Sequence, residues 1–556
     1  MFVQGRRQKT IVRPTLEGPL VPAATHPQSP GHESTGRHAF LVASGILLRS
    51  LTGLVRQRVF ARYFGQQNPI ADAFNAAFRI PNFLQNLFGE GVLSASFIPV
   101  YARLLAEGDE EESGRVAGAV FALLALTASV LTAVGMAAAP YLIDVIAMGF
   151  HGAERQLTIQ LVRILFPGTA MLVLSAWCLG ILNSHRRFFL SYTAPVVWNA
   201  AMIACLVGFH GGGQLRLATL LAWASVAGSA LQFAVQLPLV LKLAPRLRVH
   251  LDTRSGHVRE IVANFGPVFL SRGVVQISAY VDSALASLLG YGAVTGLTNA
   301  QALNMLPVSL FGMAISAAEL PAMSSALGNT EEVAAYLGRR LDSGLRRIAF
   351  FVVPCALGFL ALGDVMAGLL FQNGAFHRPD SVYVWGILAG SSVGLLATTL
   401  GRLYSSTYWA LRDTRTPLRF ALIRVALTTG LGWLSSVPLP IWLGIAPRWG
   451  VAGLTASAGV AGWVEFTLLR RTLNRRIGHT GLPAVLTAKL WLAAVVAGAL
   501  AWAVKLAIGV AHPVSGGALI LATYGAGYLA LTYALRVEES ADAVARVRRL
   551  ARTGSR

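Results

Sequence analysis

The chain has 556 residues, of which 54% are hydrophobic and 13% are charged, whereas soluble proteins average about 25% charged residues. Its mean hydropathy of +0.58 excludes a water-soluble enzyme, a secreted disulfide scaffold and a disordered protein, and leaves a polytopic membrane protein. The net charge of +21 does not indicate nucleic-acid binding, because the basic residues lie between apolar runs. The three cysteines have neither metal-ligand nor disulfide spacing.

The first 38 residues are polar and basic and contain several prolines. They lack the short apolar stretch and the small-residue cleavage site of a signal peptide. We interpret residues 1–38 as a disordered basic cytoplasmic tail; the alternative is a start site assigned too far upstream. Residues 536–556 form a second basic tail, which we also place in the cytoplasm.

Apolar runs of roughly 20 to 30 residues follow the first tail, long enough for transmembrane helices. Barrel strands would instead alternate apolar and polar residues over about 10 residues. The predicted fold class is therefore an all-α polytopic membrane protein with about 14 transmembrane helices. The predicted spans are 39–64, 71–102, 115–145, 156–183, 190–210, 216–241, 260–290, 294–325, 348–372, 379–408, 419–436, 449–469, 482–508 and 513–535.

The basic residues between the spans predict the orientation. With the first tail placed in the cytoplasm, the inside segments carry about 31 lysines and arginines and the outside loops about four. A missed or invented span would scramble this alternation. The asymmetry therefore supports an even number of spans and cytoplasmic termini.

Two of the spans, 71–102 and 294–325, share landmarks in the same order. Each has a proline, then Leu-Phe-Gly, then small residues and a second proline, at offsets of 226, 223 and 222 residues between the copies. The copies are the second and eighth spans, so both cross the membrane in the same direction. Such repeats are common in transporters. They predict two six-helix lobes, 39–243 and 254–473, related by pseudo-two-fold symmetry, with two further helices at 482–535.

The second span carries a continuous polar stripe on an otherwise apolar helix. Its members recur every three or four residues, so they share one face. A stripe of this kind lines either a wet cavity or a set of satisfied interhelical hydrogen bonds. We favour a water-filled path whose arginines bind an anion, because the guanidinium fork stays charged and meets phosphate oxygens in two places. The stripe comprises Asp72, Asn75, Arg79, Asn82, Asn86 and Glu90.

Other predicted spans also contain charged residues, and an ionised group facing lipid costs at least about 2.5 kcal/mol. The four arginines of the first span point to two faces, so some of them must face protein or water. Near span ends, long side chains reach the interface, which is the expectation for Arg402, Lys489 and Lys505. The charged residues within spans also include Arg49, Arg56, Arg58, Arg62, Arg163, Arg272, Asp282 and Arg424.

Four segments near the start of the chain resemble the opening signature of the MurJ/MviN lipid II flippase family. They read GLVRQRVFARYFG, ADAFNAAFRIPN, FGEG and FIP, at 53–65, 71–82, 88–91 and 97–99. That family is part of the multidrug/oligosaccharidyl-lipid/polysaccharide (MOP) exporter superfamily. The resemblance implies an inverted V of two lobes, alternating access around a cationic cavity, and a lipid-tail groove along the last two helices. The implied cargo is lipid II, the undecaprenyl-diphosphate-linked precursor of peptidoglycan.

The resemblance also implies, position by position, which residues contact the cargo. They are Arg56, Arg62, Asp72, Arg79, Asn82 and Glu90. Two departures matter, because Gln85 and Ala302 stand where the family commonly has arginines. We expect Arg272 to supply the missing positive charge, with Arg58 or Arg49 as alternatives.

Some members of the family bind sodium between the seventh and eleventh helices. Asp282 matches the acid of the seventh helix, but the eleventh-helix positions look like Thr428 and Gly432, which are poor ligands. Arg424 stands on the same helix. We therefore predict that Arg424 pairs with Asp282 in place of a cation.

The sequence thus predicts a transporter, not an enzyme, that flips lipid II from the inner to the outer leaflet of the bacterial cytoplasmic (inner) membrane. We expect a monomer that uses no cofactor or metal and binds no nucleic acid. A MOP exporter of another polyprenyl-linked glycan and a non-transporting homologue remain alternatives, because two family arginines are missing. A membrane glycosyltransferase fits poorly, since the first predicted outer loop, 66–69, has no carboxylate.

Overall fold

The computed structural model describes residues 32–88, 93–251, 255–326, 329–509 and 512–541. Within these ranges the chain is helical, and the only β-type pairing is an isolated bridge between Asn373 and Phe376. The main helices are α1 His32–Phe64, α2 Pro69–Phe88, α3 Ser94–Glu107, α4 Glu110–Ile146, α5 Gly152–Ser184, α6 Phe188–Gly208, α7 Gln214–Leu243, α8 Gly256–Ser287, α9 Ala293–Pro307, α10 Ala314–Ser324, α11 Thr330–Phe371, α12 Arg378–Ala410, α13 Arg415–Ser436, α14 Pro438–Trp442, α15 Gly450–Ile477, α16 Ala484–Ile508 and α17 Pro513–Ala534.

Every one of the fourteen predicted spans coincides with a helix or an interrupted helix, which confirms the fold class. The first helix begins at His32, inside the predicted tail; the remainder of that tail, 1–31, lies outside the described residues, as does most of the second tail. The ninth span is part of a longer helix that begins at Thr330, because Asn329 and Glu332 form a capping box there. Eleven of the described helices are long and apolar enough to cross a membrane. The other three predicted spans, at α1, α2–α3 and α8, hold most of the candidate cargo residues.

The internal repeat is visible in the backbone. α2 ends at Phe88, within the first Leu-Phe-Gly triplet. In the second copy a π-helical turn, Val308–Met313, contains the triplet and separates α9 from α10. Pro307 directly precedes this turn and removes a backbone donor from the helix there, whereas α2 continues through Pro81 to Phe88.

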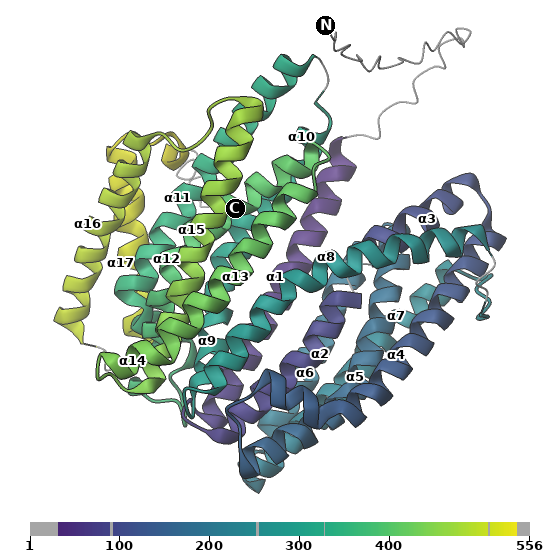
Figure 1. Ribbon diagram of the computed structural model, residues 1–556, viewed down its shortest axis with the longest axis horizontal. Helices are drawn as coiled ribbons and strands as arrows, with labels where there is room; N and C mark the ends of the chain where they lie inside the picture. Colours follow the sequence, from purple (N-terminus) through teal and green to yellow (C-terminus); the bar gives the residue numbers. More distant parts are fainter. Residues whose placement is uncertain (1–31, 89–92, 252–254, 327–328, 510–511, 542–556) are drawn as a thin grey trace, which may run out of the picture.

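Two helical lobes form the molecule, with a C-terminal hairpin beside the second (Figure 1). α2–α7 pack together with α1, and α9–α15 form the second lobe. The hairpin α16–α17 packs on α11, where the hydroxyls of Tyr524 and Tyr528 donate to the carbonyls of Pro354 and Phe350. The Lys505 ammonium lies 2.7 Å from the Asp364 carboxylate, so this lysine near the end of α16 is paired with α11.

α8 does not keep to the predicted lobe boundary. Its first turns pack on α3 and α4 of the first lobe, and its last turns on α9 and α13 of the second. Val258 and Ile261 accordingly lie in the core of the first lobe. Leu285 and Leu289 lie in the other apolar core, which contains residues of the second lobe. In Figure 1, α8 crosses the space between the lobes.

The two ends of the bundle differ. We call the end that holds residues 64–72, 288–296 and 372–377 the joined end, because one apolar cluster there contains residues of both lobes, such as Phe64 and Leu297. We call the opposite end, which holds Arg103 and Arg340, the basic end. There the first lobe has a separate core made with the start of α8 only. The lobes meet at the lower edge of Figure 1 and separate toward the upper edge.

Candidate functional site

A buried hydrogen-bond set closes the joined end between α2 and the start of α9. Asp72 is fully buried, and its carboxylate accepts bonds from the Gly292 amide (2.6 Å), the Thr295 amide (2.7 Å) and the Thr295 hydroxyl (2.6 Å). The first amides of a helix lack intrahelical acceptors, and the helix N-terminus favours a negative charge. Asp72 therefore caps α9 from the other lobe.

The same closure continues through neutral side chains. Gln66 donates to the Gly292 carbonyl at 2.6 Å and accepts from the Asn299 amide at 2.8 Å. Gln57 donates to the Asn299 side-chain carbonyl at 2.8 Å, and Asn75 donates to the Thr295 hydroxyl at 3.1 Å. Gly292 adopts φ +85, and a Cβ there would lie 2.9 Å from the Gln66 carbonyl oxygen, so glycine is required. We name this set the latch: Gln57, Gln66, Asp72, Asn75, Gly292, Thr295 and Asn299.

The latch changes the interpretation of Asp72. The resemblance implied that Asp72 contacts the cargo, but both carboxylate oxygens are occupied by the second lobe. A buried carboxylate with three donors has little capacity for another ligand. In this conformation Asp72 is thus a residue of the closure between lobes. Sequence reasoning missed Gln57, Gln66, Thr295 and Asn299, whose uncharged side chains are unremarkable until their partners are known.

Arg56 is half-buried beside aromatic rings. Its guanidinium carbon is 5.0 Å from the centre of the Phe78 ring and 5.8 Å from that of Trp198. Aromatic faces attract the cation but accept no conventional hydrogen bond from it. The Arg56 Nε is buried and has no hydrogen-bond partner among the described residues. The site therefore holds a positive charge with unused donor capacity, as an anion site requires.

Arg79 lies between α2, α9 and α8. One terminal nitrogen is 3.1 Å from the Gln301 side-chain oxygen and 3.4 Å from the Thr298 hydroxyl. The Tyr280 hydroxyl donates to the Arg79 carbonyl at 3.1 Å. Arg79 also lies close enough to Asp282 for their opposite charges to attract, as does Arg424. The stripe members whose side chains are described, Asp72, Asn75 and Arg79, thus hydrogen-bond to the second lobe.

The predicted contact between Asp282 and Arg424 is wrong, because Arg424 has another partner. Its Nε lies 2.9 Å from the carboxylate of Glu465 on α15, a residue that sequence reasoning did not single out. Arg402 of α12 adds a second positive charge to that pair. One oxygen of Asp282 is buried without a hydrogen-bond partner among the described residues. The charges thus alternate in sign from Arg79 to Asp282, Arg424, Glu465 and Arg402.

The remaining candidate residues are distributed as follows. Arg62 is exposed, with its guanidinium 5.7 Å from the Tyr63 ring centre. Arg58 donates to the carbonyls of Leu369 and Leu370 at the end of α11, so it caps a helix and does not replace a missing cavity cation. Asn82 and Arg272 belong to α2 and α8, but their side chains lie outside the described part, as does Glu90 entirely.

Sequence comparisons agree with this architecture. The profile of the family described as lipid II flippase MurJ matches residues 60–521. A lipid II flippase MurJ of Burkholderia cenocepacia is 32% identical over 447 residues, which cover 79% of this chain and 84% of that protein. A probable lipid II flippase MurJ of Rhizobium meliloti is 30% identical over 532 residues, which cover 93% and 96% of the two chains.

Solved structures share the fold. A lipid II flippase MurJ in an inward closed conformation matches with a TM-score of 0.74 at 22% identity, over 89% of this chain and 98% of that one. An inward-facing multidrug resistance MATE family transporter of the MOP superfamily matches with a TM-score of 0.61 at 17% identity, over 79% and 98%. Since the family profile spans most of the chain and the relatives cover it at 30% identity or more, the chain belongs to the lipid II flippase MurJ family.

Proposed function

We propose that this chain flips lipid II from the inner to the outer leaflet of the bacterial cytoplasmic membrane by alternating access. Membership of the family carries the proposal, and the half-buried charge of Arg56, whose buried Nε has no hydrogen-bond partner among the described residues, is the feature of this chain that supports it most directly. A diphosphate cannot enter hydrocarbon unaided, because desolvating its charges costs far more than thermal energy. Guanidinium groups between the lobes replace that hydration.

The orientation of the cycle follows from charge. The basic end carries the arginine-rich loops, so the positive-inside rule places it, with both termini, in the cytoplasm. The joined end then faces the outside, and the latch holds that side shut. This is the conformation that receives cargo from the inner leaflet. Release to the outer leaflet requires the latch to open and the lobes to close at the basic end.

The predicted domains have distinct tasks in this scheme. The two lobes rock against each other, and α8 moves with both because it packs on both. The family's tail groove would lie along α16–α17. Gly498 and Gly517 of this hairpin pack closely on α11, since a Cβ at either would lie within 3.4 Å of a side chain there. Those glycines thus hold the hairpin against the second lobe, and Gly525, with open space around it, is the better candidate for contact with an isoprenoid chain.

The test is lipid II flipping in proteoliposomes that contain the full chain. Arg56→Ala and Arg79→Ala each remove a charge-assisted contact to the diphosphate, so we expect flipping to fall about tenfold or more. The matched control is Arg155→Ala, because Arg155 is paired with Asp144 on the outer face of α4 and α5. Wild-type flipping in both site variants would contradict the proposal.

The alternative cargo is tested in the same vesicles. Gln85 and Ala302 replace family arginines, which is the feature that favours another polyprenyl-linked glycan. Transport of an undecaprenyl-diphosphate glycan of different sugar composition, without transport of lipid II, would support that alternative. Transport of neither lipid, in a chain that still binds lipid II, would indicate a non-transporting homologue.

A further inference from the structure

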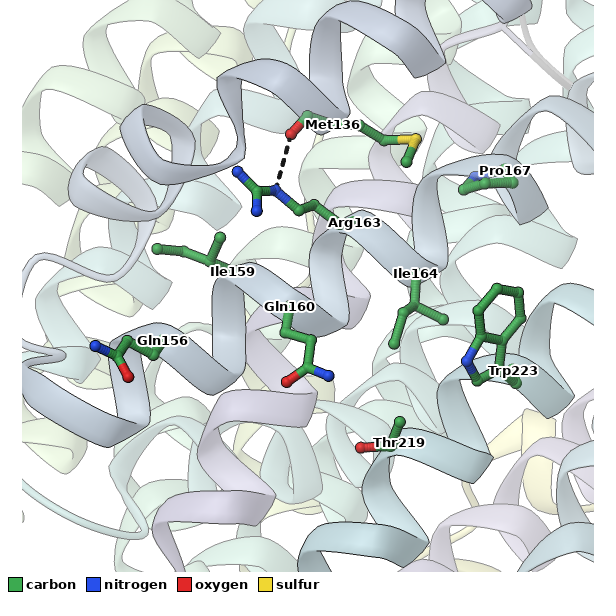
Figure 2. A pocket seen from close by; sticks show the side chains of 9 residues that line it. All are labelled: Met136, Gln156, Ile159, Gln160, Arg163, Ile164, Pro167, Thr219 and Trp223. Atoms are coloured by element: carbon green, nitrogen blue, oxygen red, sulfur yellow. Dashed lines mark hydrogen bonds between the residues drawn. The ribbon is translucent and has the colours of Figure 1, made fainter.

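A cavity of about 590 Å³ lies in the first lobe, away from the space between the lobes. Figure 2 shows its lining side chains, which come from α4, α5 and α7. The polar members are Gln156, Gln160 and Arg163 of α5 and Thr219 of α7, and the apolar members include Ile159, Ile164 and Trp223. Its volume suits one small ligand or part of a larger one.

The three polar members on α5 form a stripe on the outward face of that helix. Gln156, Gln160 and Arg163 are spaced four and three residues apart, so they share one face, and all three are exposed. Leu161 and Leu165 lie on the opposite face, where α5 is buried in the core. Neighbouring positions on α4 and α7 expose large apolar side chains, including Val134 (57% exposed) and Trp223 (55%). The cavity therefore opens toward lipid and not toward the cargo path.

The proline in α4 explains how Arg163 is held. Pro140 has no amide hydrogen, so the carbonyl of Met136, four residues earlier, has no helical donor. The Nε of Arg163 donates to that carbonyl at 3.2 Å (Figure 2). This bond uses one of the five guanidinium donors. Both terminal nitrogens remain available, and no carboxylate lies within ion-pairing distance of them among the described residues.

The position of Arg163 in the membrane selects the ligand. It lies 11 residues after the start of α5, which corresponds to a rise of about 16 Å, and inside the predicted span 156–183. A guanidinium that faces lipid at this depth is costly unless an anion accompanies it. Gln160 and Gln156 continue the polar surface from Arg163 to the membrane interface at the joined end. A lipid phosphate can therefore reach the arginine along this track.

We propose that this cavity binds a glycerophospholipid of the leaflet at the joined end, which is the outer leaflet if the orientation in the proposed function holds. The phosphodiester meets the two terminal nitrogens of Arg163 in bidentate geometry. Gln160 hydrogen-bonds the headgroup, and an acyl chain packs on Ile164 and Trp223. The lipid thus fills the space over α5 between α4 and α7 and neutralises the one cation of the cavity.

The test measures lipid retention by the purified full chain with native mass spectrometry, titrating palmitoyl-oleoyl phosphatidylglycerol. The comparison lipid is the diacylglycerol with the same chains and no phosphate. Arg163→Gln should weaken phosphatidylglycerol retention about tenfold or more, while Arg155→Gln, on the same helix but paired with Asp144, should not. Diacylglycerol should bind more weakly than phosphatidylglycerol to the wild type.

A second variant is needed because Arg163→Gln also removes the hydrogen bond from Arg163 to the Met136 carbonyl. Thr219→Trp fills the cavity and leaves Arg163 in place, so it should also weaken retention. Equal retention of phosphatidylglycerol by the wild type and both variants would overturn the proposal. Equal binding of diacylglycerol and phosphatidylglycerol to the wild type would also overturn it. Displacement of the lipid by free glycerol phosphate would do so as well, since the headgroup alone would then be the ligand. The measurement contains no lipid II, so a negative result would contradict the phospholipid site but not the proposed transport function. Conversely, a failure to flip lipid II would not contradict the phospholipid site.

Discussion

The joined end and the basic end are held by different kinds of contact. At the joined end, the carboxylate of Asp72 and several neutral side chains form buried hydrogen bonds between the lobes. At the basic end, the described ion pair between α3 and α8, Arg103 with Glu260, has its two side chains 46% and 43% exposed. Buried bonds to a charged group contribute about 1.5–3 kcal/mol each, whereas exposed ion pairs contribute about 0–1 kcal/mol.

This difference shows where the conformational balance is set. A buried set of bonds opposes opening at the joined end, while water already competes for the contacts at the basic end. Opening at the joined end must therefore be compensated by new contacts elsewhere, such as those made by bound cargo. The comparison predicts that substitutions in the latch shift the equilibrium between conformations more than substitutions at the basic end.

The largest effect is expected for Asp72→Ala, which removes the charged member of the latch. The Gly292 and Thr295 amides lose their acceptor, so we expect the closed conformation to lose about 2–4 kcal/mol relative to the open one. Spin labels at the exposed positions 216 and 378, one on each lobe, would report a longer distance by pulsed electron resonance. Asp144→Ala removes an exposed carboxylate and should leave the distance distribution unchanged.

A smaller effect is expected for Thr295→Val, which keeps the shape of the side chain and the backbone bond to Asp72. The hydroxyl both donates to Asp72 and accepts from Asn75, so its loss should destabilise the closed conformation by about 1–2 kcal/mol. The same label pair should show a partial increase in the open population. An effect as large as that of Asp72→Ala would mean that the carboxylate's charge is not the main contributor.

The smallest effect is expected for Arg103→Gln at the basic end. Loss of this exposed ion pair should change the conformational equilibrium less than either latch substitution, and the change should shrink further in high salt because exposed charges are screened. Labels at the same two positions should give a distribution close to that of the wild type. A shift comparable to that of Thr295→Val would show that α8 is held to the first lobe mainly by this pair.

The amino-acid sequence alone determined the spans, the repeat and the polar stripe of α2. Hydropathy and helical period are local properties, so they do not depend on how helices are placed. The landmarks shared by 71–102 and 294–325 predicted two six-helix lobes, and two helical lobes form the molecule. The stripe placed Asp72 and Arg79 on one face of α2, and the structure shows that both hydrogen-bond to the other lobe.

Only the tertiary structure decided the partners. Asp72 meets an amide 220 residues away in the chain, Arg58 caps a helix 311 residues away, and Arg424 pairs with Glu465 instead of Asp282. Charge and spacing show which residues could form such pairs, but they do not show which pair forms. Differences of a few ångströms in helix placement decide which oppositely charged groups touch. For the same reason α8 packs on both lobes although its sequence assigns it to one.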